Sequence, residues 1–522
     1  MHRETMIRQL NDHVWDVCVI GGGATGLGVA VDAASRGLKT VLFEKYDFAK
    51  GTSSRSTKLV HGGVRYLQQG NIRLVLDALS ERGLLLKNAP HLVKNLSFVI
   101  PNYEWWESPF YGLGLKAYDW MAGSLGLGST EFLSTEETID LVPTIDQKGL
   151  RGGIRYHDGQ FDDTRMAIHL AMTAADHGAV VLNYFSVEEL IKDNGKISGV
   201  RVTDSINNNT YVINAKSVIN ATGVFADMMM KMDNSEAASI IQPSQGIHLV
   251  FDKEFLPGTT AVMIPRTDDG RVLFAVPWHH KIIVGTTDTP VENPTIEPMA
   301  TTTEIDFVLE HIRHYLSIDP SYTDIKSVFC GLRPLVKGGD KSTAALSRDH
   351  HINISESGMI TITGGKWTTY RRMAEDTINM AVQIFQLPAE KSQTTHLHLH
   401  GYMEDVDFEL PFYYYGSDGD QILNMVTENP SLSEKIHDEF PNIIAEVHWA
   451  VKEEMCMTIE DFLARRSRML FLDAGASIEA ASRVASIMAR LLGKDENWIN
   501  AEVSQYTLLA NSYLPNQNSG IV

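Results

Sequence analysis

The sequence predicts an α/β protein that carries an inserted, mostly antiparallel sheet and ends in an α-helical domain. Three observations lead to this fold class. A strand–glycine turn–helix–strand pattern occupies residues 15–45, β-type runs crowd residues 240–290, and residues from about 415 to 511 are mostly helical in composition. A chain of 522 residues is also longer than a single compact domain usually is, so roughly two to four domains are expected.

The N-terminal pattern is a βαβ unit. WDVCVI at 15–20 predicts a strand, GGGATGLG at 21–28 predicts a glycine turn that enters a helix, and KTVLFEK at 39–45 predicts a second strand. A strand, a glycine-rich turn and a helix in this order place free N–H groups and the positive end of the helix dipole at one point. The unit therefore predicts a binding site for the phosphates of a nucleotide.

The glycine spacing in this unit is G-x-G-x-x-G. Gly21 allows the tight turn, Gly23 lets the backbone approach a pyrophosphate, and Gly26 lets the helix pack closely on the strand. Glu44 ends the second strand and can accept hydrogen bonds from a ribose diol. The motif predicts a dinucleotide site but does not by itself separate FAD from NAD.

The next segment, residues 48–76, is basic in an otherwise acidic chain. It contains no Asp or Glu, whereas the whole chain has 45 basic and 65 acidic residues and a net charge of −20. Small hydroxyl residues, including Thr52 and Ser53, precede a Gly-Gly pair that lies between His61 and Arg65. This composition predicts backbone folded tightly around a ligand, with His61 and Arg65 beside it.

Two further predicted strands, near 220 and near 362, end in small residues. NATG closes the first strand, and ITITGGKWTTYRR carries the second into a helix. An extended dinucleotide that touches three such strand ends fits FAD better than NAD. The residues that we expect against the cofactor at the two later ends are Ala221, Gly223, Gly364, Gly365 and Lys366.

The β-type runs at 240–290 predict a substrate platform inserted in the cofactor-binding domain. His248 lies in its first strand. Another acid-free segment, residues 325–339, contains Arg333. Cationic groups from separate segments, such as Arg333 and Lys366, suit a phosphate dianion.

The overall charge and composition exclude several classes of partner. An acidic chain lacks the basic face that nucleic acid requires, so no nucleic-acid partner is expected. Three widely spaced cysteines and incomplete histidine groups predict neither a disulfide framework nor a metal site. No apolar run of about 18 residues occurs, and the N-terminus has no signal-like apolar region, so any membrane contact is expected at the surface.

One aromatic segment, residues 98–128, is relevant to such a contact. Trp and Tyr favour membrane–water interfaces, while Lys116 and Asp119 exclude a simple spanning helix. A packed cap or a subunit contact explains the same composition, and both interpretations stay open. The aromatic residues are Trp105, Trp106, Phe110, Tyr111 and Trp120.

Together the motifs resemble the FAD-dependent glycerol-3-phosphate dehydrogenases of the aerobic, respiratory type. The resemblance covers most of the chain and is carried by VIGGGATGLGVAVDAASRGL, TSSRSTKLVHGGVRYL, NATGVFAD, GTTD, GLRPL, GGKWTTYR and EEMCMTIEDFLARRSRMLF. It implies a glutathione-reductase-type, Rossmann-like FAD-binding domain. It also implies oxidation of sn-glycerol 3-phosphate to dihydroxyacetone phosphate, with electrons passed to a membrane quinone.

The resemblance further implies a location and an assembly. Members are peripheral proteins of the inner, cytoplasmic face of the cytoplasmic membrane, and they often form homodimers. We expect a discontinuous FAD-binding domain, a substrate-binding or cap region, a linker and a helical domain. The FAD-binding domain is expected at 12–90, 150–235 and 326–387, and the substrate-binding or cap region at 91–149 and 236–325. The linker is expected at 388–412 and the helical domain at 413–522.

The resemblance also assigns roles to site residues. Arg65 and Arg333 contact the substrate, and Lys366 supports the phosphate or the flavin region. His61 matches a histidine near the flavin, and His248 matches one in the substrate sheet. We expect hydride transfer to flavin N5, with His61 as the favoured base and His248 as the alternative. Related oxidases share these motifs, so an oxygen-using glycerol-3-phosphate oxidase and a non-catalytic flavin-binding redox sensor are the alternative functions.

Overall fold

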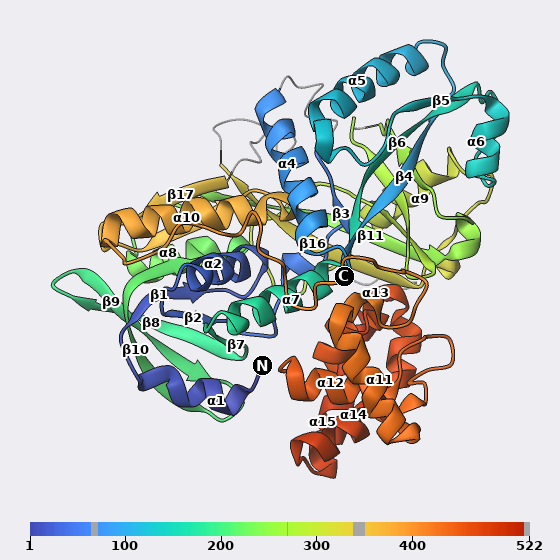
Figure 1. The fold of residues 1–522 in the computed structure, drawn as a ribbon. Coiled ribbons are helices and arrows are strands. Elements are labelled where there is room, and N and C mark those ends of the chain that lie inside the picture. The colour runs from blue at the N-terminus through green and yellow to red at the C-terminus, as the bar shows by residue number, and fades with distance from the viewer. Residues whose placement is uncertain (64–70, 269, 338–349, 516–522) are drawn as a thin grey trace.

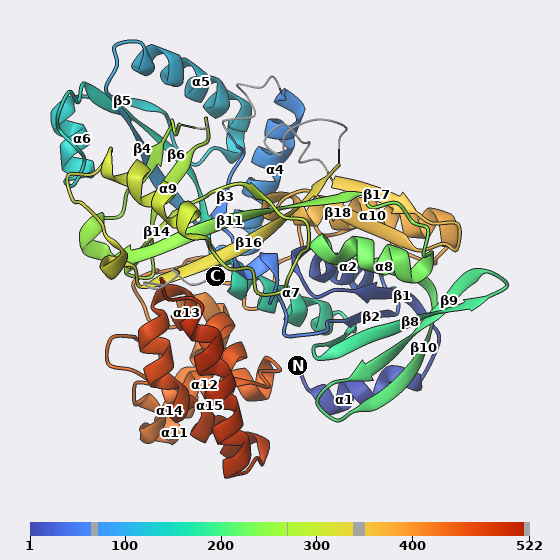
Figure 2. The ribbon, with the colours of Figure 1, turned by 180° about the vertical axis from the view of Figure 1, so that it is seen from behind.

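The structure, a computed structural model, describes residues 1–63, 71–268, 270–337 and 350–515. Two mixed sheets and a C-terminal group of helices make up this part of the chain (Figures 1 and 2). This arrangement confirms the predicted fold class. Within the described residues, no helix combines the length and the apolar composition needed to cross a bilayer.

The first sheet is built around β1, whose six residues are all buried. Its parallel neighbours are β2 and β10, and the order β17-β18-β10-β1-β2-β7 continues the sheet to both edges. An antiparallel extension, β8–β9, joins it through β10. The strands are β1 (Trp15–Ile20), β2 (Thr40–Phe43), β7 (Val180–Leu182), β8 (Phe185–Asp193), β9 (Lys196–Asp204), β10 (Asn209–Asn220), β17 (His350–Ile354) and β18 (Ile360–Gly364).

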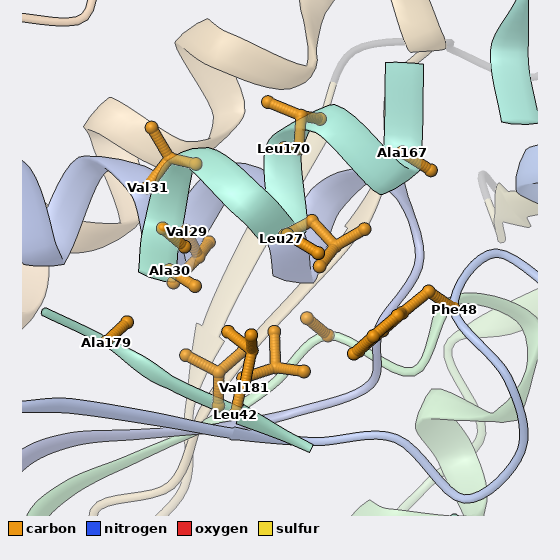
Figure 3. Close-up of a cluster of buried hydrophobic side chains, with 14 of the residues drawn as sticks. Leu27, Val29, Ala30, Val31, Leu42, Phe48, Ala167, Leu170, Ala179 and Val181 are labelled. Atoms are coloured by element: carbon orange, nitrogen blue, oxygen red, sulfur yellow. The ribbon is translucent and has the colours of Figure 1, made fainter. Parts of the chain in front are cut away.

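Helix α2 packs on this sheet between two other helices, and its small residues allow the close approach. A Cβ on Gly28 would meet the ring of Tyr370 at 2.7 Å. Figure 3 shows Leu27 of α2, Leu170 of α7 and Leu42 of β2 in one buried cluster. The helices around the sheet are α1 (Arg3–Arg8), α2 (Ala24–Ser35), α7 (Asp163–Asp176), α8 (Ala226–Asp233) and α10 (Tyr370–Phe385).

The second sheet is mostly antiparallel, as expected, with a parallel pairing between β4 and β12. Its path is β15-β11-β14-β13-β12-β4-β6-β3, with β16 paired to β11 and β5 to β6. Its strands are β3 (Leu59–Val60), β4 (Val93–Asn102), β5 (Glu131–Leu133), β6 (Gly152–Phe161), β11 (Ile241–Asp252), β12 (Ala261–Ile264), β13 (Leu273–Trp278), β14 (Lys281–Gly285), β15 (Thr289–Pro290) and β16 (Ser327–Val336). The helices that accompany it are α4 (Ile72–Asn88), α5 (Glu107–Ala122), α6 (Thr135–Leu141) and α9 (Thr302–Arg313).

Three strands of the second sheet come from segments that we expected to belong to the cofactor-binding domain, the first being β3, which falls within 12–90 and pairs with β6. β6 falls within 150–235 and β16 falls within 326–387, yet β6 pairs with β4 and β16 pairs with β11, each along its whole length. A β-type sequence pattern specifies a strand but not the strand with which it pairs. The expected boundaries of the domains therefore differ from the sheet membership at these three strands.

The C-terminal helices pack below the second sheet, with α13 next to β16 (Figure 1). Ser327 Oγ of β16 donates to Leu470 O, and Val328 N donates to Tyr513 O. A buried ionic contact also joins this region to the first sheet, because Arg465 and Arg466 bind Asp47. The helices are α11 (Gly419–Glu428), α12 (Ile444–Glu453), a π-helical turn (Asp461–Arg466), α13 (Met469–Leu472), α14 (Ala474–Leu492) and α15 (Glu496–Asn511).

Candidate active site

A cavity of about 680 Å³ lies at the C-terminal ends of β1, β2, β10 and β18, and the second sheet lines its other side. Ligands of open α/β sheets bind at this end of the strands, and the volume is typical of a small-molecule site. Every expected site residue that the structure describes lines the cavity, except Gly26. These residues are Gly21, Gly23, Glu44, Thr52, Ser53, His61, Ala221, Gly223, His248, Arg333, Gly364, Gly365 and Lys366.

The glycine turn is shaped by close contacts that exclude side chains. Gly21 has φ +108°, and a Cβ there would lie 2.7 Å from Ala221 O. Gly26 lies outside the cavity because it packs on the turn itself, where a Cβ would overlap Gly21 O. The backbone at the end of β1 is therefore open to a ligand, and α2 begins directly beneath it.

The N-terminus of α2 faces the cavity. Its N-cap residue is Gly23, which has no side chain to occupy the helix end, and its first turn contains no acidic residue. Ser53 Oγ accepts a hydrogen bond from Ala24 N at 2.9 Å. Free N–H groups and the positive end of the helix dipole make this a favourable position for a pyrophosphate.

Glu44 is held rigidly at the end of β2. Its Oε2 accepts from Gly22 N at 2.6 Å, and its Oε1 accepts from Tyr46 N at 2.8 Å. Burial raises the pKa of the Glu44 carboxyl above its ordinary value, and the two backbone bonds act in the opposite direction. A carboxylate oxygen can accept a further bond, so Glu44 can also bind a ribose hydroxyl.

The hydroxyl-rich loop after β2 is held by hydrogen bonds at two adjacent residues. Thr52 Oγ1 donates to Leu332 O at 2.6 Å, and Trp367 Nε1 donates to Ser53 O at 2.9 Å. These bonds join the loop to β16 and to the turn that follows β18. Trp367 was not among the expected site residues, and its indole bond connects two segments separated by more than 300 positions, which no local signal in the sequence reveals.

The two histidines differ in environment. His61 N donates to Thr368 Oγ1 at 3.3 Å, and the His61 side chain is half-buried. His248 is buried, its Nε2 lies 2.9 Å from Thr57 Oγ1, and its ring stacks on Phe329. Burial, aided by the charges of Arg333 and Lys58, holds the pKa of His248 well below its usual range, so this ring is neutral near pH 7.

A buried ion pair fixes the loop segment before β3 that carries Thr57. Asp163 accepts from Ser56 Oγ at 2.7 Å and from Lys58 Nζ at 2.7 Å, and both side chains of the ion pair are fully buried. Thr57 is therefore held between two residues bound to the same carboxylate. Sequence reasoning identified the basic segment but missed Thr57 and Asp163, because Asp163 lies about a hundred positions away.

Arg333 is oriented by residues of β11 and of the turn after β14. Its Nη2 donates to Thr286 Oγ1 at 3.1 Å, and its Nη1 lies 3.4 Å from Asp288 Oδ1, which also accepts from Ser244 Oγ. Lys366 lines the same cavity from the turn after β18. The structure thus brings two expected phosphate ligands into one cavity, whereas the third, Arg65, lies outside the described residues.

The residues that line the cavity are suited to binding FAD. The open glycine turn and the α2 N-terminus suit its pyrophosphate, and Glu44 suits its ribose. The same cavity is also lined by Ala221 and Gly364 and, at its end on the side of the second sheet, by His248 and Arg333. At that end, His248 Nδ1 is buried and has no hydrogen-bond partner among the described residues, so a polar group remains to be satisfied by a ligand.

Two family models match the chain. The model described as FAD dependent oxidoreductase matches residues 16–371, which cover the first sheet and the inserted sheet. The model described as C-terminal domain of alpha-glycerophosphate oxidase matches residues 357–498. The first match spans more than half of the chain and includes all the residues that line the cavity.

Proteins with similar sequences include mitochondrial glycerol-3-phosphate dehydrogenases. The chain is 42% identical to the mitochondrial glycerol-3-phosphate dehydrogenase of Homo sapiens, over 95% of this chain and 73% of that protein. It is 38% identical to the protein of that name from Schizosaccharomyces pombe, over 95% of this chain and 87% of that protein.

Solved structures agree with this similarity. The glycerol-3-phosphate dehydrogenase from Bacillus halodurans complexed with FAD matches 99% of both chains, with a TM-score of 0.81 and 29% identity. L-alpha-glycerophosphate oxidase from Mycoplasma pneumoniae matches 73% of this chain and 97% of that chain, with a TM-score of 0.58. Its identity is 19%, so it shows similarity of fold alone.

Proposed function

Because the chain belongs to the glycerol-3-phosphate dehydrogenase family of FAD-dependent oxidoreductases, we propose that it oxidises sn-glycerol 3-phosphate to dihydroxyacetone phosphate and passes the electrons to a membrane quinone. One observation carries the proposal. A single cavity is lined by a dinucleotide-binding turn, by His61 and His248, and by Arg333 and Lys366 among its cationic residues. The names of the sequence relatives support the same substrate.

The cofactor-holding residues occupy one end of this cavity. Gly21, Gly23 and the α2 N-terminus would hold the pyrophosphate of FAD, and Glu44 would bind its ribose. Bound FAD supplies a two-electron acceptor that takes hydride at N5. Everything else in the reaction falls to the side chains of the protein, which bind the substrate, orient it and accept its proton.

The cationic residues bind the substrate phosphate. A guanidinium offers a planar fork of donors to phosphate oxygens, and an ammonium adds a compact charge. Thr286 and Asp288 fix the direction of the Arg333 guanidinium before substrate arrives. Holding the phosphate at Arg333 and Lys366 sets the position of the C2 carbon, and such orientation is a large part of the rate of an enzyme reaction.

The hydroxyl proton passes to a histidine, and we assign this role to His61. The buried His248, with its depressed pKa, is a weak base in the structure as it stands. His248 instead offers a fixed ring nitrogen to the substrate, with the opposite nitrogen held by Thr57. His61, which is half-buried, lines the same cavity and is therefore our choice of base.

The two alternative functions are less well supported. An oxygen-using oxidase is suggested by the C-terminal family model, but the relatives at 38–42% identity carry the name dehydrogenase. A redox sensor would need FAD but no pair of cations that binds a phosphate. Hydrogen peroxide formation in air distinguishes an oxidase from an enzyme that reduces a quinone.

An anaerobic absorbance scan tests the substrate and the cofactor together. The purified protein is scanned before and after addition of sn-glycerol 3-phosphate, with glycerol and lactate as controls. The proposal predicts loss of the flavin bands with glycerol 3-phosphate and little change with the controls. Unchanged bands after addition of glycerol 3-phosphate would contradict the proposed substrate and favour the sensor.

The electron acceptor determines where the enzyme works. A quinone is held within a bilayer, so we propose that the protein lies peripherally on the inner, cytoplasmic face of the cytoplasmic membrane and forms a homodimer there. The acceptor is tested by comparing turnover with a soluble dye and with a quinone in vesicles. Turnover with the dye but none with the quinone would refute this part of the proposal.

A further inference from the structure

The loop between β15 and α9, residues 291–301, forms part of the cavity wall. Its sequence, VENPTIEPMAT, contains two prolines, which lack the N–H that regular structure requires, so the loop depends on other contacts for its position. Gln245 Nε2 of β11 donates to Met299 O near one end of the loop. Ile296, in the middle, lines the cavity, and its Cδ1 lies 4.0 Å from the position that a Cβ on Gly51 would take. The middle of the loop therefore packs against the hydroxyl-rich loop at the cofactor end of the cavity.

Arg55 holds the middle of this loop by two hydrogen bonds. Its Nη1 donates to Ile296 O at 2.8 Å, and its Nη2 donates to Glu297 Oε2 at 2.6 Å. The side chain of Arg55 is 3% exposed and that of Glu297 is 25% exposed, and Arg55 itself lines the cavity. Because a buried guanidinium without a carboxylate partner is an uncompensated charge, Arg55 favours the position of the loop in which Glu297 meets it.

The C-terminal helices complete this contact. Tyr513, which follows α15, donates from its hydroxyl to Glu297 Oε2 at 3.1 Å. Lys50 Nζ lies 3.5 Å from Glu297 Oε1 and 2.6 Å from Oε2 of Glu460, which directly precedes the π-helical turn. Burial opposes the charge of Glu460, but Arg465 and Lys50 lower its pKa to about 2, so this carboxylate is ionised at neutral pH. Glu297 is thus connected, directly and through Lys50, to two segments of the C-terminal helices.

We propose that Glu297 is a positioning residue for the cofactor. Its bonds to Arg55 and Tyr513 keep Ile296 in the wall beside the hydroxyl-rich loop, and the C-terminal helices thereby slow the release of FAD. Among the described residues, the last in sequence that lines the cavity is Thr368, so the C-terminal helices act on the cofactor through this loop. The inference depends on FAD binding alone and goes beyond the oxidation of glycerol 3-phosphate.

The rate of FAD release from the holoenzyme tests this role. The full-length holoenzyme is diluted into flavin-free buffer, and protein is separated from free flavin at fixed times, so that the retained flavin absorbance gives the dissociation rate constant. Glu297→Gln removes the charge and keeps the shape of the side chain. Its matched control is Glu434→Gln, because Glu434 forms an exposed ion pair with Arg483 among the C-terminal helices.

A milder variant keeps the test decisive if Glu297→Gln does not fold. Tyr513→Phe removes the single hydroxyl that donates to Glu297, and its control is Tyr506→Phe, because Tyr506 is also buried in the core of the C-terminal helices. We expect Glu297→Gln to release FAD about tenfold faster, which corresponds to about 1.4 kcal/mol, and Tyr513→Phe about threefold faster. Both controls should release FAD at the rate of the unmodified protein.

A role in retention also predicts that Glu297→Gln keeps the kcat of the unmodified protein when a soluble dye is reduced with glycerol 3-phosphate in excess FAD. Unchanged release of FAD from Glu297→Gln and Tyr513→Phe would overturn the proposal. Equal acceleration in a variant and its control would also overturn it, because that result shows a general loosening of the C-terminal helices. Absence of dye reduction by the unmodified protein would count against the proposed substrate, whereas the release rates would still decide the role of Glu297.

Discussion

Thr57→Val tests whether a single hydrogen bond holds His248 for the reaction. Valine keeps the shape of threonine and removes the hydroxyl that lies 2.9 Å from His248 Nε2. The ring is buried, and its Nδ1 has no partner in the described part of the chain, so the substitution leaves both ring nitrogens without a protein partner.

The size of the effect follows from that burial. Removing the partner of a buried polar group costs about 1–3 kcal/mol. Part of this cost falls on folding and part on substrate binding, because the released ring can turn away from the cavity. We expect kcat/KM for glycerol 3-phosphate to fall about tenfold, or about 1.4 kcal/mol, with a smaller change in kcat alone.

The assay is steady-state turnover with a soluble acceptor from pH 6 to pH 9, together with a thermal unfolding curve. Thr57→Ser should restore both kcat/KM and its pH profile, because serine keeps the hydroxyl. A merely structural role would lower the melting temperature without changing the pH profile. If Thr57→Val retains the kcat/KM and the pH profile of the unmodified enzyme, the positioning role is refuted.

Three other substitutions probe the base, a pH-dependent contact and the glycine turn. His61→Asn should slow anaerobic flavin reduction about a hundredfold in stopped-flow absorbance, whereas an unchanged rate and pH profile would transfer the role of base to His248. Burial opposes protonation of His400, but Asp176 and Asp418 bind both ring nitrogens and raise its pKa to about 9. The pKa of His400 in the folded protein thus exceeds its value of about 6.5 in the unfolded chain. The contribution of His400 to the stability of the fold is therefore full below about pH 6.5 and is lost as the pH rises through about 9. The free energy of unfolding should therefore fall by about 2 kcal/mol between pH 7 and pH 10, and the melting temperature should fall with it. His400→Gln should flatten this pH dependence. An equal fall in both proteins would exclude the contact. Gly26→Ala should lower the free energy of unfolding by about 2 kcal/mol and reduce the flavin content of the purified protein, because the Cβ of alanine would overlap Gly21 O. Full flavin content would show that the turn tolerates the methyl group.

Local sequence patterns were sufficient for the first sheet and for the cofactor end of the cavity. The spacing of Gly21, Gly23 and Gly26 acts within a few residues, and the structure shows the close contact of Gly26 with the turn. The strand ends at Ala221 and Gly364 converge because parallel strands share one end of a sheet. Each of these features depends on a short stretch of chain and one general rule of packing.

Contacts between distant segments could not be predicted from the sequence. Asp163 binds Ser56 and Lys58 across more than a hundred positions. The segment HLHLH at 396–400 has Glu404 and Asp405 close by in the sequence, yet the fold brings the more distant Asp176 and Asp418 to His400. In both cases the pattern identifies a polar residue, while its partner is set by how helices and loops pack.

The central claim is that cationic side chains at the far end of the cavity select a phosphorylated alcohol. The most direct test is the concentration dependence of anaerobic flavin reduction in Arg333→Met, with Arg201→Met of the exposed β9 pair as the control. Loss of a charge-assisted contact worth about 2 kcal/mol should raise the apparent Kd for glycerol 3-phosphate about thirtyfold and leave the weak reaction with glycerol unchanged. An unaltered Kd for glycerol 3-phosphate in Arg333→Met would contradict the account.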